Sequence, residues 1–319
     1  MIAELYIQCG GTVYQPAVLD GMQWSTERKG TPGKLTFQVV KDAALNFQEG
    51  NPVKLIVDGV NCFFGYIFKK QRTKSNIISV TAYDQLRYFK NKDTYCYIGK
   101  TASQLLQMIC DDFNLNAGEI EETGYVIPQR VESNKTLFDI SQTGLDITML
   151  NTNKVYVLYD DFGAITLKNI ASMKIPLIID AETGQTFDYT SSIDEQTYNQ
   201  VKLTFDNDKT GKRDIYMAKD SSHINEWGIL QYYDTLEEGE NGAAKAEKLL
   251  EAYNKKTRKL KISGVFGDVR IRAGTAPLIR LDLGDVTVNN FMVVSNVTHT
   301  FNNGIHTMDL NLEGGEFIA

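Results

Sequence analysis

The stretch Val297-Thr298-His299-Thr300-Phe301-Asn302-Asn303-Gly304-Ile305-His306-Thr307-Met308-Asp309-Leu310 determines how the C-terminal end of this sequence folds. Apolar and polar residues alternate on both sides of Asn303-Gly304, which favours a two-residue type I′ turn because both central positions need a positive φ. A register shifted by one residue would set the apolar row against Thr298 and Thr300. The β-hairpin is therefore predicted to pair Phe301 with His306, His299 with Met308, and Val297 with Leu310.

This register makes His299 and His306 neighbours on one face of the hairpin. Two imidazoles at this spacing can share a zinc ion, but zinc sites use three or four ligands. The pattern places no cysteine or carboxylate on the same face, so we predict two half-buried, hydrogen-bonded histidines rather than a metal site. The third histidine, His223, lies in the polar, turn-like run 219–223.

Outward from this hairpin, the N-terminal region also shows strand patterns. Residues 34–40 alternate between apolar and polar, and the apolar runs 53–57 and 60–68 flank Asp58-Gly59, a second hairpin signal. With a further strand at 76–83, these runs predict a small barrel or sandwich.

The pattern changes near residue 100. Thr101 and Gln104 have the spacing of a capping box, and apolar residues at helical spacing follow them as far as residue 113. A second helix is predicted at 137–150 and another hairpin at 155–168. These elements predict an α+β region inserted between two strand-rich regions.

Beyond residue 191 the strand signals return, interrupted by one amphipathic helix. Strands are predicted at 201–205, 213–217, 259–265 and 278–283. The fold class is therefore α+β and mainly β, with three domains predicted at residues 1–97, 98–190 and 191–319, the last containing the helix 243–256.

Composition excludes several classes of protein. Of the 319 residues 42% are hydrophobic, which is enough apolar surface for a folded chain. The formal charge of −7 argues against sequence-independent nucleic-acid binding. No signal peptide and no run of ~20 apolar residues is found, so we expect no membrane insertion. The four cysteines are widely spaced without a CxxC pair, which indicates free thiols and synthesis in a reducing cytoplasm.

No pattern predicts an enzyme. Asp161-Phe162-Gly163 matches a kinase triplet, and Gly314-Gly315-Glu316-Phe317 resembles a diguanylate cyclase signature, but both lack the other parts of those sites. The first triplet lies in a predicted hairpin turn, where Asp and Gly are turn formers. Adjacent acidic residues are usually solvated, and glycine-rich phosphate loops are absent. We predict no catalytic, cofactor-binding or metal-binding residue, and no cofactor.

Several strings resemble the XkdQ/YqbQ-like phage tail proteins of Gram-positive prophages, and the closing hairpin is similar to that family as well. The strings are Trp24-Ser25-Thr26-Glu27-Arg28-Lys29-Gly30-Thr31-Pro32-Gly33-Lys34-Leu35-Thr36-Phe37, Glu49-Gly50-Asn51-Pro52-Val53, Phe64-Gly65-Tyr66-Ile67-Phe68 and Ala82-Tyr83-Asp84-Gln85-Leu86-Arg87-Tyr88.

This resemblance implies the baseplate hub of a contractile tail, whether of a phage, a prophage or a phage-tail-like bacteriocin. It implies two tail-tube-like β-barrels and a small inserted LysM-like module around the helix 101–113. Three subunits would form a ring that joins the hexameric tail tube to the trimeric central spike. The implied partners are the tube protein, the spike protein, and other baseplate and LysM-type tail proteins. The protein would assemble in the host cytoplasm and end in the baseplate of the particle.

Two other functions compete with the hub. A tail-associated peptidoglycan hydrolase would need paired carboxylates across a cleft. A receptor- or glycan-binding module is suggested by the 16 Tyr residues, but tyrosines on strands are more often part of cores and interfaces.

Overall fold

A computed structural model of the protein describes residues 1–72, 76–207, 211–236, 240–282 and 287–314. Most of the string Gly314-Gly315-Glu316-Phe317 lies outside these residues. The chain forms two compact units. The larger contains Met1–Asp188 and Leu260–Ala319, and the smaller contains Tyr189–Lys259.

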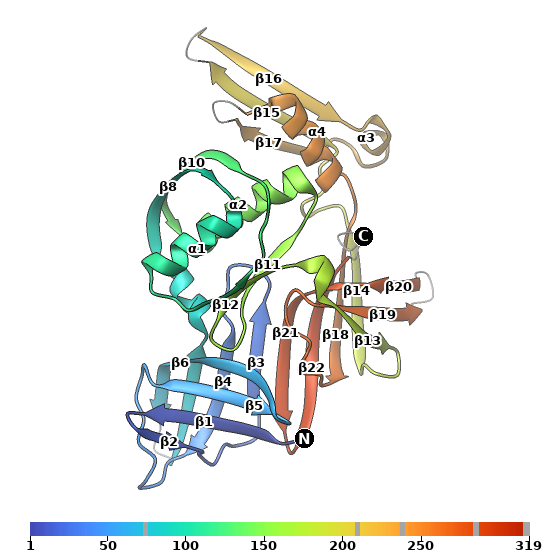
Figure 1. The fold of residues 1–319 in the computed structure, drawn as a ribbon. Coiled ribbons are helices and arrows are strands. Elements are labelled where there is room, and N and C mark those ends of the chain that lie inside the picture. The colour runs from blue at the N-terminus through green and yellow to red at the C-terminus, as the bar shows by residue number, and fades with distance from the viewer. Residues whose placement is uncertain (73–75, 208–210, 237–239, 283–286, 315–319) are drawn as a thin grey trace. The chain divides into compact units, whose positions relative to one another are not determined.

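The N-terminal part of the larger unit is a series of antiparallel strands (Figure 1). Strands β5 and β6 meet at Asp58 and Gly59, whose φ angles of 47° and 80° confirm the predicted Asp-Gly hairpin. Alternate side chains along the strands are buried and form one apolar core. The strands are β1 (Ala3–Cys9), β2 (Thr12–Tyr14), β3 (Met22–Glu27), β4 (Lys34–Val40), β5 (Pro52–Val57), β6 (Val60–Arg72) and β7 (Ile77–Tyr83).

The C-terminal hairpin extends this same sheet. It consists of β21 (Val293–Asn302) and β22 (Ile305–Glu313), and β21 pairs antiparallel with β3. Phe301 on β21 packs into the core of the N-terminal strands. The predicted register is confirmed, because Phe301 pairs with His306, His299 with Met308, and Val297 with Leu310.

The two strand-rich ends of the chain therefore share one sheet of 11 strands, in the order β14-β18-β22-β21-β3-β4-β7-β6-β5-β1-β2. Strand β14 spans Thr186–Ser192, and β18 spans Thr257–Phe266. The predicted mainly β fold is confirmed. Two closed barrels are not observed, because no pairing in the described part of the chain joins the edge strands β14 and β2, and β21 pairs with β3 of the other strand-rich region.

The region between β7 and β12 has its own core. Helix α1 (Ala102–Asp112) begins with the predicted capping box, formed by Thr101 and Gln104, and α2 (Leu137–Thr152) confirms the second predicted helix. Both helices pack against a ribbon of two strands, β8 and β10 (Figure 1). The other elements here are η1 (Gln85–Lys90), β8 (Lys92–Lys100), β9 (Ala117–Ile120), β10 (Ile127–Thr136), β11 (Tyr156–Asp160), β12 (Ile165–Asn169) and η2 (Ile170–Met173).

A separate three-stranded sheet completes the larger unit. Its strands are β13 (Lys174–Asp180), β19 (Ala276–Asp282) and β20 (Thr287–Phe291), and β13 runs parallel to β19.

In the smaller unit, helix α4 (Gly242–Tyr253) packs against β15 and β16 of a sheet with the order β16-β15-β17. The predicted strand pair and helix are confirmed. Residues 221–227 form helix α3, so the expectation of a turn at 219–223 is wrong; Asp220 caps this helix by accepting two main-chain N–H groups. The bounds are β15 (Gln200–Asn207), β16 (Lys212–Lys219), α3 (Ser221–Trp227) and β17 (Gln231–Thr235).

Within the ranges that the structure describes, no helix combines the length and the apolar character needed to cross a membrane.

Candidate functional site

A buried polar junction connects segments of the larger unit that lie far apart in the sequence. Its centre consists of Asp84 at the start of η1, Asp160 at the end of β11, and Arg272 in the connection between β18 and β19. The two aspartates are each 5% exposed, and the side chain of Arg272 is 16% exposed. We call these three residues the Arg272 junction.

Asp84 fastens the loop between β3 and β4 onto η1. Its Oδ1 accepts the N–H of Leu86 at 3.1 Å, and its Oδ2 accepts the N–H of Gly33 at 2.9 Å. A Cβ atom at Gly33 would lie 2.3 Å from Oδ2, which is well inside contact distance. The loop can therefore approach this carboxylate because residue 33 has no side chain.

Asp160 connects the turn between β11 and β12 to the same helix. Its Oδ1 accepts the N–H of Gly163 at 2.6 Å, and its Oδ2 accepts the N–H of Gln85 at 3.2 Å. The Gln85 side chain extends this network, donating to the carbonyl of Gly163 at 2.5 Å and accepting the N–H of Asn116 at 2.9 Å. Within this network, Gly163 acts as a turn residue, as predicted.

Arg272 supplies positive charge beside these acids. Its Nη2 donates to the main-chain carbonyl of Asp160 at 2.7 Å, and its Nη1 lies 3.6 Å from the Asp161 carboxylate. The guanidinium carbon lies 3.9 Å from the centre of the Tyr159 ring, within the range of a cation–π contact. The junction therefore combines a charge-assisted hydrogen bond, an ion pair and a ring contact around one arginine.

Burial dominates the electrostatics of the junction. It raises the pKa of Asp84, which the nearby Asp160 carboxylate raises further, and it raises the pKa of Asp160. Burial also lowers the pKa of the Arg272 guanidinium, although the surrounding acids oppose this shift. Each group thus loses hydration on folding, and the opposite charges compensate one another.

The junction contains paired carboxylates, which a glycoside hydrolase needs, but their surroundings favour a structural role. Both oxygens of Asp84 and of Asp160 already accept a main-chain N–H. A catalytic acid must instead face a substrate. The adjacent cavity has a volume of about 10 Å³, enough for about one water molecule, whereas ligand pockets typically have roughly 300–1,000 Å³.

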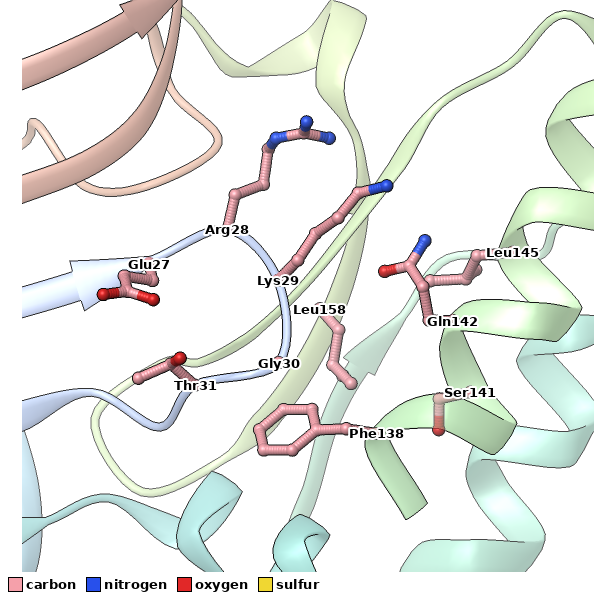
Figure 2. Close-up of a pocket in the computed structure, with 10 residues that line it drawn as sticks. All are labelled: Glu27, Arg28, Lys29, Gly30, Thr31, Phe138, Ser141, Gln142, Leu145 and Leu158. Carbon is pink, nitrogen blue, oxygen red and sulfur yellow. The ribbon is translucent and has the colours of Figure 1, made fainter. Parts of the chain in front are cut away.

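A second cavity lies between the β3–β4 loop and α2 (Figure 2). Figure 2 shows the side chains of Lys29 and Gln142 approaching each other from the loop and the helix, with the ring of Phe138 below them. Arg28 forms an ion pair with Glu313 at 3.0 Å. The cavity has a volume of about 10 Å³, so it offers room for about one water molecule and not for a substrate.

The two histidines of the C-terminal hairpin are neighbours, as predicted, with Nδ1 of His299 2.9 Å from Nε2 of His306. Nε2 of His299 lies 2.9 Å from the carbonyl oxygen of Ile271. A carbonyl can only accept, so Nε2 carries the proton and Nδ1 of the neutral ring accepts from His306. Trp24 stacks on His299 at 4.6 Å between ring centres.

His299 is fully buried rather than half-buried, because β21 lies between β3 and β22 in the sheet. Burial lowers the pKa of His299 to about 3, with a further contribution from His306, and it also lowers the pKa of His306. Among the described residues, no three His, Cys, Asp or Glu side chains form a group that could hold a metal ion.

Sequence reasoning assigns no residue to a site and misses the Arg272 junction. The hairpin predicted at 155–168 is present, but its pattern does not indicate that Asp160 is buried at the turn. The available signal was the string Ala82-Tyr83-Asp84-Gln85, in which two polar residues follow a strand with alternate buried side chains. Nothing local to Arg272 indicates that it is buried among acids.

Comparison with known proteins identifies relatives along nearly the full chain. A family model described as YQBQ-like matches residues 22–313. The protein YqbQ of Bacillus subtilis (strain 168), described as uncharacterized, is 28% identical over 306 residues, which cover 94% of this chain and 92% of that protein. The phage-like element PBSX protein XkdQ of the same strain is 27% identical over 270 residues, or 83% and 81% of the two chains.

A solved structure shares the fold at low sequence identity. The 43 kDa tail protein of prophage MuSo2 from Shewanella oneidensis aligns with a TM-score of 0.70 and 12% identity, covering 99% of this chain and 100% of that one. The fold is therefore that of a prophage tail protein.

Proposed function

The chain belongs to the YQBQ-like family, as its resemblance to XkdQ/YqbQ-like proteins predicted, and we propose on this basis that it is a structural protein of a phage tail or tail-like particle. The observation that carries the proposal is the fold match over almost the whole length of a prophage tail protein. In this proposal the protein is made in the host cytoplasm and functions in the baseplate of the particle, without enzymatic activity.

The more specific proposal is a baseplate hub. Three copies form a ring that joins a hexameric tail tube to a trimeric central spike, and other baseplate and LysM-type proteins bind around it. The strand-rich regions act as tube-like modules, two in each copy, so that a threefold ring offers six similar surfaces to the tube. Two predictions belong to this proposal. They are the domain limits 1–97, 98–190 and 191–319, and a LysM-like module around α1.

The open edges of the large sheet support assembly. Strands β14 and β2 end the sheet of the described chain, and each has a row of main-chain groups without a partner strand. Open edges favour pairing with other chains and are otherwise an aggregation hazard. Pairing between subunits would give the main-chain groups of these edges hydrogen-bond partners. In the ring it would extend the sheet that ends at β14 and β2 in one copy.

Co-purification with the spike protein tests the proposal. The full-length chain, tagged and expressed in cells that produce the particles, is expected to copurify with spike and tube proteins and to appear as a threefold ring in electron microscopy. Its absence from a complete tail preparation would refute the proposal. Clearing of peptidoglycan in a zymogram, abolished by Asp160→Asn, would favour the hydrolase instead.

A further inference from the structure

The ribbon formed by β8 and β10 has a surface that the described chain leaves uncovered. One face packs on α1 and α2, and the opposite face presents Ile98, which is 71% exposed, and Val131, which is 58% exposed. Cys96 is also exposed and lies directly opposite Val131 in the register. In the described ranges these two strands pair with each other and with no further strand, so each has an open outer edge.

The ribbon carries more positive than negative charge. Its two strands contain four basic and two acidic residues. One of the acids, Glu132, is fully buried and is neutralised by Arg130 at 3.0 Å and Lys135 at 2.7 Å. Two copies of this surface would bring like charges together. The ribbon therefore fits a different, acidic surface rather than a second ribbon.

Such a surface lies at one open edge of the 11-stranded sheet. Strand β14 ends the 11-stranded sheet, and its Phe187 is 52% exposed. Residues 180–188 contain three acidic residues and no Lys or Arg, and Glu182 and Asp188 are exposed. This edge thus offers unpaired main-chain groups, an exposed aromatic ring and negative charge.

We infer that the ribbon β8–β10 of one copy binds the N-terminal half of β14, residues 186–188, of a second copy by strand addition. Main-chain pairing would join the two open edges, Phe187 would cover Ile98 and Val131, and opposite charges would set the orientation. This inference rests on the proposed ring and names a contact that builds it. Because two different surfaces meet, the contact is head-to-tail, and such contacts build rings where the rotation between copies closes, as the proposed threefold ring requires.

A disulfide between copies tests the contact, with Cys96 as a natural probe. Phe187→Cys is introduced in a Cys9→Ser background, in both the purified full-length chain and assembled particles. A disulfide requires Cα atoms about 4.4–6.8 Å apart, so oxidation is expected to give covalent trimers. The matched control is Ile305→Cys, which places a thiol at a position 61% exposed in the hairpin turn. Crosslinking of Phe187→Cys no better than this control would overturn the inference.

Charge exchange tests the same contact by a second route. Lys100→Glu is expected to reduce the crosslinked fraction of the Phe187→Cys chain several-fold, and adding Asp188→Lys is expected to restore it. An unchanged crosslinked fraction would overturn the charge argument. Trimers by native mass spectrometry without this crosslink would refute the contact and leave the hub intact. Covalent trimers of a protein absent from tail particles would refute the hub and leave the contact.

Discussion

The Arg272 junction and the pair of His299 and His306 are both buried polar sites of the larger unit, but they are built differently. The junction gathers two acids and a guanidinium from three segments of the chain, and it depends on charge compensation. The histidine pair lies within one hairpin, and its buried ring is neutral. Replacing any one of its three charged residues is therefore expected to destabilise the junction. The histidine pair is expected to lose stability mainly when His299 is protonated.

The two sites also respond to acid in opposite directions. The raised pKa values of Asp84 and Asp160 mean that the native state holds protons on these carboxyls more readily than the unfolded chain. Their contribution to stability is therefore largest below about pH 3.9 and is lost as the pH rises through the folded values. The lowered pKa of His299 has the reverse effect, with stability lost as the pH falls below about 6.5.

The largest effect is expected from Arg272→Met. Arg272 pairs with the exposed Asp161 and lies beside the buried Asp84 and Asp160, so this change leaves the two buried acids without a nearby cation. Leaving buried charges uncompensated in this way costs about 3–5 kcal/mol. Urea denaturation at pH 7 measures this loss. Arg270→Met is the matched control, because its side chain is 58% exposed and pairs with Asp268 in solvent, so little change in stability is expected. Equal losses in both variants would contradict a charge-dependent junction.

A smaller loss of stability is expected from Gly33→Ala, which tests the close approach of the β3–β4 loop to Asp84. Gly33→Ala places a Cβ atom 2.3 Å from Oδ2 of Asp84, so the loop must move and the hydrogen bond from residue 33 weakens. A loss of about 1–3 kcal/mol in the free energy of unfolding is expected for such overpacking. Gly11→Ala is the control, since a Cβ atom at that position would have no neighbour within 4 Å. Similar stabilities of the two variants would show that the loop adjusts freely.

The same contrast explains what could be predicted from the sequence. One turn was enough to predict that His299 and His306 are neighbours, because the Asn303-Gly304 turn sets the register of pairing within its hairpin. The strands, the capping box of α1 and the mainly β class are equally local signals. The pairing of β21 with β3 and the approach of Arg272 to Asp160 join residues far apart in the sequence, and no periodicity within a segment specifies its distant partner.

The smallest change is expected in the pH dependence of stability, which tests whether His299 is neutral in the native state. Lowering the pH from 6.5 to 5.5 is expected to cost the wild-type chain about 1 kcal/mol through His299, because the unfolded histidine gains a proton that the folded ring does not accept. His299→Gln removes this contribution. Between pH 6.5 and pH 5.5, the unfolding free energy of the variant should therefore fall by about 1 kcal/mol less than that of the wild-type chain. The readout is the difference in pH dependence between the two chains, which is separate from any constant loss caused by the lost stacking on Trp24. Parallel pH profiles would show that His299 takes up a proton as readily in the native state as in the unfolded chain, and the histidine pair would then not be a neutral buried site.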